Sequence, residues 1–287
     1  MSVRVPDSLE ELVTGLAADP GCELLAGGTD LMVEINFGRR RPASIMSLSR
    51  VTELKGWSED AATGELVLGG ALTYTEMLQP DLAGRLPALA QAARTVGSPQ
   101  IRNAGTLGGN LATASPAGDT LPVLVALDAV VVVESADGRR EVPVGDFVTG
   151  AKRTALRPHD VVHSVRVPTR RTRQEFLKVG TRNAMVIAVC SAAVVVDLDS
   201  CSVRVALGSV GPVPLRAHEA EELAGELLDW DAGGVLAGDA HRDGALERFA
   251  GLVSAASRPI DDHRSTAAYR RHAVGVCARR ALERVAA

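Results

Sequence analysis

A stretch of small and polar residues between Val96 and Asp119 constrains the fold of this chain more than any other part of the sequence. It contains Thr106-Leu-Gly-Gly-Asn110, and almost no bulky side chain occurs between Gly105 and Asp119. Such a run cannot fill a hydrophobic core, but its glycines allow close backbone approach. Its amides, hydroxyls and carboxamides can therefore contact a polar ligand. Composition alone leaves an ordinary surface loop equally open.

A second glycine pair lies upstream, in Leu24-Leu-Ala-Gly-Gly-Thr-Asp-Leu31. Residues 23–26 predict a short buried strand, and Thr29 or Asp30 can cap a helix over 31–37. A strand, a glycine pair and a helix start form a corner where free amides and the positive end of the helix dipole face an anion. A plain strand-to-helix turn is the alternative. The Rossmann and Walker glycine motifs are absent.

The composition is typical of a globular protein and argues against a nucleic-acid partner. The 287 residues are 46% hydrophobic but only 3% aromatic, so the core must consist mainly of Ala, Val and Leu. A net charge of −4 disfavours phosphate backbones as partners. The N-terminus shows no signal-peptide core, and the most apolar window, 184–196, is too short to span a bilayer. We therefore expect a cytoplasmic protein without a membrane span.

The four cysteines do not form a metal-binding pattern. They are Cys22, Cys190, Cys201 and Cys277, and no Cys-x-x-Cys pair occurs among them. A zinc or iron–sulfur site built from this chain alone is therefore not expected. Buried structural thiols in a reducing compartment are the expected state.

The length of 287 residues predicts two domains, 1–168 and 169–287, with the first divided into subdomains of about 1–55 and 56–168. The polar and basic stretch 168–174 marks the boundary. A capping box, Ser8-Leu-Glu-Glu11, starts a helix that Pro20-Gly21 ends. Further strands are expected over 44–48, 65–70, 129–134, 140–144, 161–167, 176–179, 188–197 and 202–208. Further helices are expected over 73–78, 86–95, 121–127, 218–228, 244–257 and 265–285.

The order and spacing of the two glycine segments resemble those of a known flavin family. Ile101-Arg-Asn-Ala-Gly-Thr-Leu-Gly-Gly-Asn-Leu111, followed by Ser115-Pro116 and Asp119, is similar to the second FAD segment of the FAD subunits of molybdenum hydroxylases. This medium-chain family includes subunits of xanthine dehydrogenase and aerobic carbon monoxide dehydrogenase. Residues 24–31 stand where the family carries its first FAD segment, and 258–271 resemble its closing signature. The resemblance covers essentially the whole chain.

The resemblance implies an α+β fold. It consists of a two-subdomain FAD-binding domain of the PCMH/VAO-like type and a small C-terminal domain with a three-stranded antiparallel sheet and helices. By position, the family's FAD contacts correspond to Leu24, Leu25, Ala26, Gly27, Gly28, Thr29, Asp30, Leu31, Val96, Thr106, Leu107, Gly108, Gly109, Asn110, Thr113, Asp119, His163 and Lys178. The first eight would wrap the pyrophosphate and ribityl region. The second segment and Asp119 would complete the phosphate and sugar contacts.

Several of these positions have a structural alternative. Asp119 can cap the helix that follows it, and Lys178 can be an ordinary solvated lysine at a strand end. His163 departs from the apolar residue of the family, so its neighbour Val162 is an alternative. Family members often shield the isoalloxazine ring with an aromatic side chain. This sequence offers Val96 at one candidate position and residue 184 or 185 at the other.

The function implied by the resemblance is electron transfer through FAD. In the family, electrons leave a substrate at a molybdenum centre on a large subunit and cross two iron–sulfur clusters on a small subunit. They then reach the FAD of the medium subunit and pass to NAD⁺, a quinone or another acceptor. The implied assembly is a dimer of heterotrimers, and no residue of this chain need act as a catalytic acid or base. Two alternatives stay open: a self-sufficient FAD-dependent oxidase or reductase, and a non-redox scaffold that has lost FAD.

Overall fold

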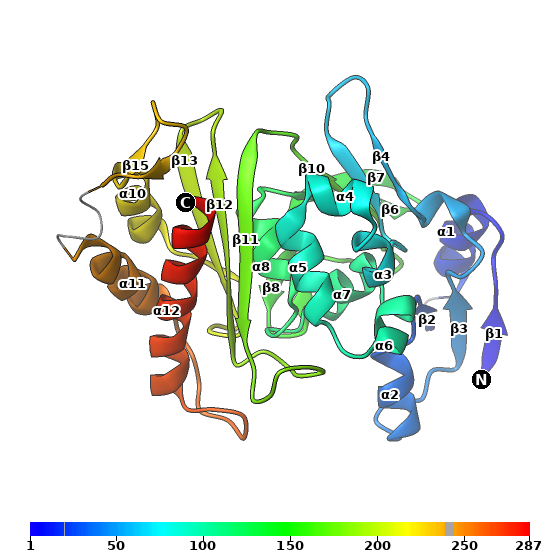
Figure 1. Ribbon diagram of the computed structural model, residues 1–287. Coiled ribbons are helices and arrows are strands. Elements are labelled where there is room, and N and C mark those ends of the chain that lie inside the picture. The colour runs from blue at the N-terminus through cyan, green and yellow to red at the C-terminus, as the bar shows by residue number, and fades with distance from the viewer. Residues whose placement is uncertain (20, 239–243) are drawn as a thin grey trace.

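The computed structural model describes residues 1–19, 21–238 and 244–287. Figure 1 shows an elongated molecule in which a small parallel sheet lies at one end, a helix-rich body lies in the middle, and an antiparallel sheet covered by helices lies at the other end. The role expected for Pro20 in ending the first helix lies outside the described residues. Among the described helices, none is long and apolar enough to cross a membrane.

The N-terminal layer is a three-stranded parallel sheet with the order β1-β3-β2. Its elements are β1 (Ser2–Arg4), α1 (Leu9–Ala18), β2 (Cys22–Leu25), α2 (Leu31–Asn36) and β3 (Ser44–Ser47). α1 begins where the Ser8 side chain accepts a hydrogen bond from the Glu11 amide, and it buries Leu12 and Leu16. β2 ends one residue before the glycine pair, so the loop leaves the carboxyl edge of a parallel sheet, where ligands commonly bind.

The middle sheet has the order β4-β5-β10-β6-β7, and all its neighbours are antiparallel. Its strands are β4 (Trp57–Glu59), β5 (Leu66–Gly69), β6 (Val130–Ser135), β7 (Gly138–Pro143) and β10 (Val161–Val167). The 3-10 helix η1 (Thr52–Leu54) precedes it, and the short hairpin β8 (Val148–Gly150) and β9 (Arg153–Thr154) lies nearby in sequence. The register of β10 against β6 shifts between Val162 and Ser164.

Short helices fill the connection between β5 and β6. They are α3 (Tyr74–Met77), α4 (Pro80–Arg85), α5 (Pro87–Thr95), α6 (Pro99–Ala104), α7 (Leu107–Thr113) and α8 (Thr120–Ala126), with α9 (Val144–Phe147) after β7. The small-residue stretch is therefore two helices rather than the open loop expected from its glycines. Ser98 and Thr106 explain the difference, because each side chain accepts an amide hydrogen bond and caps one of these helices.

The C-terminal sheet has the order β11-β12-β13-β14. Three long antiparallel strands, β11 (Thr172–Val179), β12 (Cys190–Asp197) and β13 (Ser202–Gly208), form it as expected, and the two-residue β14 (Leu215–Arg216) is added. The remaining elements are α10 (His218–Glu226), β15 (Leu228–Asp229), β16 (Val235–Leu236), α11 (Ala245–Ala256) and α12 (Ala267–Val285). The last two helices pack together, and α12 covers one face of β11 and β12.

The long strand β12 is buried on both faces. Ala193 and Val195 belong to the hydrophobic core of the middle body, where α8 packs against the sheet. Ala192, Val194 and Val196 belong to a second core, which α12 completes. This explains why the strand reads as a continuous apolar run rather than an alternating one.

The cysteines fulfil the sequence expectation only in part. Cys190 and Cys277 are buried and free, Cys22 is half-buried, and Cys201 is exposed. The exposed position of Cys201 follows from the turn between β12 and β13, where it adopts a positive φ of 48°.

Candidate functional site

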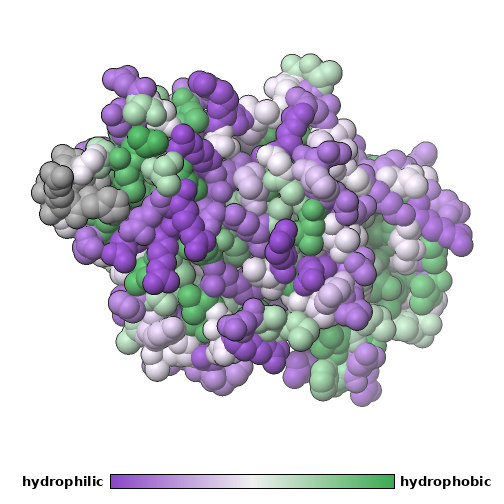
Figure 2. Space-filling model, viewed as in Figure 1, coloured by the Kyte–Doolittle hydropathy of each residue, from purple (hydrophilic) through white to green (hydrophobic). Residues whose placement is uncertain are grey.

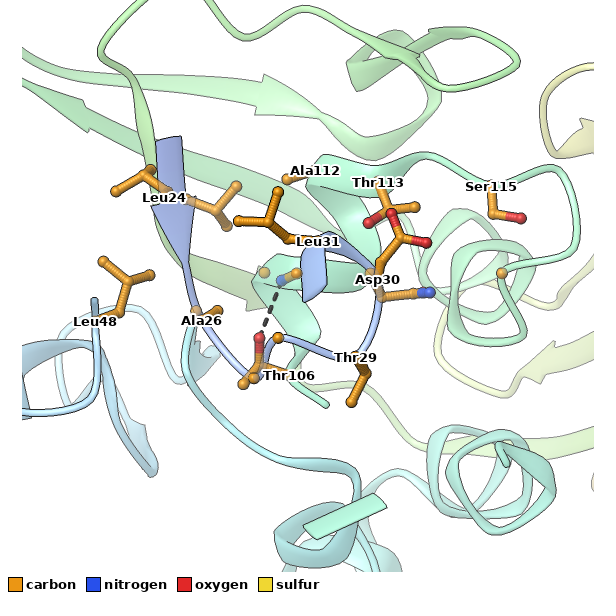
Figure 3. A pocket seen from close by; sticks show the side chains of 18 of the residues that line it. Leu24, Ala26, Thr29, Asp30, Leu31, Leu48, Thr106, Ala112, Thr113 and Ser115 are labelled. Carbon is orange, nitrogen blue, oxygen red and sulfur yellow. Dashed lines mark hydrogen bonds between the residues drawn. The ribbon is translucent and has the colours of Figure 1, made fainter. Parts of the chain in front are cut away.

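One cavity of about 770 Å³ lies between the N-terminal layer and the helices of the middle body. β2, the loop after it and α2 form one side, and α7 with the segment up to Asp119 forms the other. Figure 3 shows Leu24, Ala26, Thr29 and Leu31 facing Thr113 and its neighbours on α7 across this hollow. The two glycine segments, far apart in the sequence, therefore line the same cavity.

The loop after β2 leaves its backbone amides free. Gly28 has a φ of +70°, a conformation that favours glycine. A Cβ atom at position 27 would lie 1.7 Å from the carbonyl oxygen of Ala104, so only glycine lets the loop pass the end of α6. Among the described residues, no acceptor pairs with the amides of residues 27–30. Asp30 stands at the N-cap of α2 without a side-chain capping bond, which leaves an amide-rich corner for an anion.

The second glycine segment has the opposite property, because its amides are already paired. The Leu107 amide donates to Leu72 O at 2.9 Å, and the Gly108 amide donates to Gly70 O at 2.8 Å. The Gly109 amide donates to the Thr106 hydroxyl at 3.1 Å. The expectation that this segment would offer its backbone amides to a ligand is therefore wrong. Its glycines serve close packing instead, since a Cβ at position 108 would lie 2.7 Å from Gly70 O.

Asp119 does not cap the helix that follows it. It stands at the N-cap of α8 but makes no side-chain capping bond. Its Oδ2 instead accepts from Lys178 Nζ at 2.6 Å and from Thr95 Oγ1 at 3.3 Å, and both charged side chains are only 6% exposed. Asp119 lines the cavity, and its Oδ1 is buried without a hydrogen-bond partner. Burial raises the pKa of the Asp119 carboxyl, and Lys178 beside it opposes that rise.

Lys178 is therefore not the solvated lysine that the structural alternative described. It rises from β11 of the C-terminal sheet, and its ammonium also donates to Thr95 O at 3.2 Å. It is not among the cavity-lining residues, because Asp119 stands between it and the cavity as its hydrogen-bond acceptor. Among the candidates from sequence, Leu25, Leu107 and His163 also do not line the cavity.

His163 lies outside the cavity wall because of the β-bulge in β10. The register shift between Val162 and Ser164 breaks the alternation of side chains, so Val161 and Val162 both line the cavity. His163 is half-buried, its Nδ1 lies 3.0 Å from the Ser164 hydroxyl, and burial lowers its pKa. The apolar neighbour named as the alternative is the residue at the cavity.

The remaining sequence candidates all line the cavity. They are Leu24, Ala26, Gly27, Gly28, Thr29, Asp30, Leu31, Val96, Thr106, Gly108, Gly109, Asn110, Thr113 and Asp119. Of the positions considered for covering a flavin ring, Val96 lines the cavity, whereas residues 184 and 185 do not and Ile187 does. Their roles toward FAD stay predictions.

The sequence reading missed several lining residues, including Tyr74, Ile101, Lys152 and Ile187. Tyr74 meets the second glycine segment only in space, where its amide donates to Gly105 O at 3.1 Å, so the sequence offered no direct signal for it. Arg40 also lines the cavity and pairs with Glu23 at 2.7 Å. Charged surface side chains carry no sequence signal for such a position.

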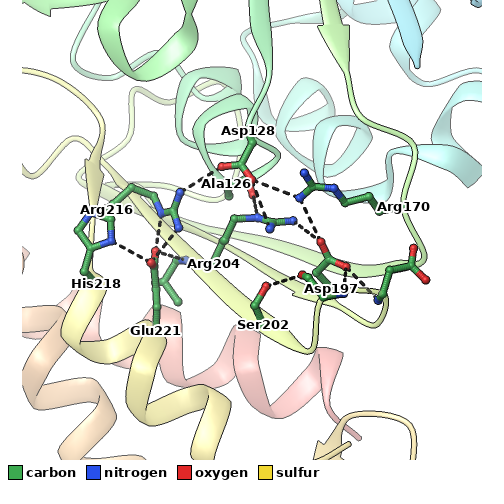
Figure 4. A network of polar contacts seen from close by, with 12 residues as sticks. Ala126, Asp128, Arg170, Asp197, Ser202, Arg204, Arg216, His218 and Glu221 are labelled. Carbon is green, nitrogen blue, oxygen red and sulfur yellow. Dashed lines mark hydrogen bonds and ion pairs between the residues drawn. The ribbon is translucent and has the colours of Figure 1, made fainter. Parts of the chain in front are cut away.

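A second polar cluster lies away from the cavity, where α8 meets the C-terminal sheet (Figure 4). Arg204 donates to Ala126 O at 2.8 Å and pairs with Asp197 at 3.0 Å, and Arg170 pairs with Asp197 at 3.1 Å. The Asp128 carboxylate forms ion pairs with all three of Arg170, Arg204 and Arg216. Although burial opposes it, hydrogen bonds from Ser200 and Arg204 hold the pKa of Asp197 at about 2. These charges satisfy one another, so the cluster holds two layers together rather than binding a ligand.

No group of three or more His, Cys, Asp or Glu side chains in the described part of the chain is arranged to hold a metal ion.

Comparisons with known proteins agree with the geometry of the cavity. Residues 1–170 match the family model described as the FAD binding domain in molybdopterin dehydrogenase, and residues 175–285 match the CO dehydrogenase flavoprotein C-terminal domain. The chain is 34% identical over 210 residues to the nicotinate dehydrogenase FAD-subunit of Eubacterium barkeri, covering 70% of each chain. It is 31% identical over 286 residues to the glyceraldehyde dehydrogenase medium chain of Sulfolobus acidocaldarius, covering 98% of this chain and 96% of that one.

Solved structures of related proteins resemble this chain over its full length. A carbon monoxide dehydrogenase chain from Hydrogenophaga pseudoflava superposes with a TM-score of 0.87 at 30% identity, covering 100% of this chain and 96% of that chain. A chain of quinoline 2-oxidoreductase from Pseudomonas putida superposes with a TM-score of 0.88 at 26% identity, covering 100% and 96%. The chain belongs to the family of FAD-binding subunits of molybdenum hydroxylases, which are oxidoreductases, and its cofactor is FAD.

Proposed function

We propose that this chain is the FAD-carrying electron-transfer subunit of a molybdenum-containing hydroxylase or dehydrogenase. It takes electrons from iron–sulfur clusters on a partner subunit and passes them to NAD⁺ or another acceptor. The observation that carries the proposal is the cavity between the two glycine segments, with free amides at residues 27–30 and a buried carboxylate at Asp119.

The residues around the cavity fit FAD. The free amides of residues 27–30 suit a diphosphate, and Gly27 sits where a side chain would collide with Ala104. The unpartnered Oδ1 of Asp119 suits a hydroxyl or N–H donor of the ligand. When bound, FAD supplies the redox chemistry, and the residues of this chain bind it, orient it and limit access of water.

We further propose an iron–sulfur small subunit and a molybdenum-cofactor large subunit as partners, in a dimer of heterotrimers. Several relatives are named medium chains or medium subunits, which supports an assembly with smaller and larger chains. Figure 2 shows hydrophobic residues gathered around the N-terminal layer, where Val33 of α2 is 44% exposed and Phe37 is 72% exposed. Exposed apolar surface of this kind often marks a protein–protein interface. A cytoplasmic location suits the four free thiols.

The test is to purify the chain with and without the products of neighbouring genes and to identify any flavin released on denaturation by mass spectrometry. Stoichiometric FAD is expected for the wild type, and weakened retention is expected for Gly28→Val, Asn110→Ala and Asp119→Ala. Gly84→Ala is the matched control, because Gly84 is exposed on α4 and a Cβ there meets no atom.

The electron route is tested on the co-purified complex. Addition of the substrate of the large subunit should bleach the flavin absorbance of the complex but not of the isolated chain. Bleaching of the isolated chain by that substrate would instead support a self-sufficient flavoenzyme. Absence of FAD even after reconstitution with the partners would contradict the proposal as a whole.

A further inference from the structure

The turn between α5 and α6 is held by an arginine side chain. α5 ends at Thr95, and the last carbonyls of a helix have no partner inside the helix. Arg102 lies in the last turn of α6 and reaches back, so that its Nη1 donates to Val96 O and to Gly97 O, both at 3.0 Å. Lys178 supplies the donor to the preceding carbonyl, Thr95 O. Two cations therefore cap the end of α5.

The same turn packs tightly on α6. Gly97 has a φ of +43°, and a Cβ atom there would lie 2.8 Å from Cγ2 of Ile101. Ser98 starts α6, because its side chain accepts a hydrogen bond from the Ile101 amide, and its carbonyl accepts the Arg102 amide at 3.0 Å. The Arg102 side chain thus closes a ring of contacts from the end of one helix to the next. This ring fixes Val96 relative to Ile101.

Val96 and Ile101 give the cavity an aliphatic surface. Both residues line the cavity, whereas Arg102 does not, so its guanidinium acts on the backbone behind the cavity wall. Aliphatic side chains attract the face of an aromatic ring only at van der Waals contact, and a gap of about 0.5–1 Å already loses a quarter to a half of that attraction. The backbone position of Val96 and Ile101 therefore decides how well a planar ring binds against them.

Arg102 has no other partner in the described part of the chain. There its guanidinium makes hydrogen bonds only to Val96 O and Gly97 O, and no carboxylate pairs with it. Arg94, in the last turn of α5, offers a comparison, because it is exposed and its side chain makes no hydrogen bond or ion pair with the described residues. The charge of Arg102 therefore serves the two carbonyls, and hydrogen bonds from a charged donor are among the stronger ones.

We propose that Arg102 is a positioning residue for FAD. By holding the carbonyls of Val96 and Gly97, it fixes the aliphatic surface of Val96 and Ile101 at the distance where a planar ring of the cofactor packs on it. FAD contains two such rings, the isoalloxazine and the adenine, and the experiment distinguishes them. The proposal rests on the proposed function in taking FAD as the ligand.

The first experiment titrates FAD and, separately, ADP into the full chain freed of flavin, for the wild type, Arg102→Met, Arg102→Lys and Arg94→Met. Arg102→Met keeps the aliphatic stem but removes the donors, so FAD should bind about tenfold more weakly. Arg102→Lys retains a cationic donor and should recover part of the loss. Arg94→Met is the matched control, because Arg94 is exposed on the neighbouring helix, and it should bind FAD as the wild type does.

The absorption spectrum of the bound flavin and the affinity for ADP identify the ring. If the isoalloxazine packs on Val96 and Ile101, Arg102→Met should shift the flavin absorption bands and leave ADP affinity unchanged. If the adenine packs there, ADP should bind as much more weakly as FAD does, with the flavin bands unchanged. Wild-type affinities and bands in Arg102→Met would overturn the proposal. A wild-type chain that binds no FAD would instead contradict the proposed function.

A double-mutant cycle separates positioning from a general loss of structure. If Arg102 acts through Val96, Arg102→Met should reduce FAD affinity less in a Val96→Ala background than in the wild type. Equal reductions in the two backgrounds would show that Arg102 acts elsewhere, and they would overturn the positioning role. Urea unfolding of each flavin-free variant gives the folded fraction, so that a loss of stability is not counted as a loss of affinity.

Discussion

The two glycine segments that line the cavity differ in how their backbone is used. Both contain a glycine pair: the first lies in the loop between β2 and α2, and the second lies in the first turn of α7. Residues 27–30 keep their amides free among the described residues, whereas the amides of residues 107–110 donate to Leu72, Gly70 and Thr106. A glycine pair thus has two distinct uses: to expose amides to a ligand, or to let two backbones pack closely.

The surroundings of each segment explain the difference. The first segment leaves a parallel sheet at its carboxyl edge and passes the end of α6, yet its amides find no acceptor among the described residues. The second packs against the turn that follows β5, where the carbonyls of Gly70 and Leu72 accept its amides. Glycine content therefore indicates close approach, and the neighbouring carbonyls decide whether the partner is ligand or protein.

The largest effect is expected from Gly27→Ala. Its new Cβ would overlap Ala104 O, so the loop must move and its amides lose their arrangement. FAD affinity should fall by about a hundredfold or more, and the flavin-free chain should lose about 1–3 kcal/mol of stability through overpacking. FAD titration and urea unfolding measure the two effects. Wild-type affinity in this variant would remove the first segment from the ligand site.

A smaller effect on binding is expected from Gly108→Ala. The Cβ would press on Gly70 O, and the strain falls on packing between α7 and the end of β5. The flavin-free chain should again lose about 1–3 kcal/mol of stability. FAD affinity should change by less than about tenfold once the folded fraction is accounted for. If FAD affinity falls as far as in Gly27→Ala, the two segments contribute equally to ligand binding, and the distinction between them is wrong.

The smallest effect is expected from Thr106→Val. This change removes the hydroxyl that accepts from the Gly109 amide and should destabilise the chain by about 1 kcal/mol, as loss of a helix cap does. Thr106→Ser keeps the hydroxyl and is the control, which should unfold at nearly the wild-type denaturant concentration. A serine variant as unstable as the valine variant would show that packing of the methyl group, not capping, is what matters.

The sequence predicted the first segment better than the second because its signals are local. A strand, a glycine pair and a helix follow one another directly in residues 22–36, so their geometry can be read from the order alone. The partner of Asp119 could not be read in this way. Lys178 is 59 positions away, on a strand of another sheet, and the ion pair exists only because α5 and α8 pack on β11 and its neighbours.

The bulge in β10 shows a second limit of sequence reasoning. Strict alternation would place Val162 and His163 on opposite faces without saying which meets the cavity. The register shift puts two consecutive valines at the cavity wall and turns the histidine toward Ser164. A bulge depends on the pairing with β6, which has no signature in β10 itself.

The burial of β12 on both faces joins the two parts of the chain through a shared hydrophobic core. Ala193 and Val195 belong to the same core as Leu121 and Val123 of α8, so the division of the sequence near residue 170 does not divide the hydrophobic core. Cutting the chain there would expose a valine-rich face on one fragment and leave Asp119 without its cation on the other. Heating should therefore melt the molecule in one cooperative transition, and a cofactor bound at Asp119 would stabilise the C-terminal sheet that it does not touch.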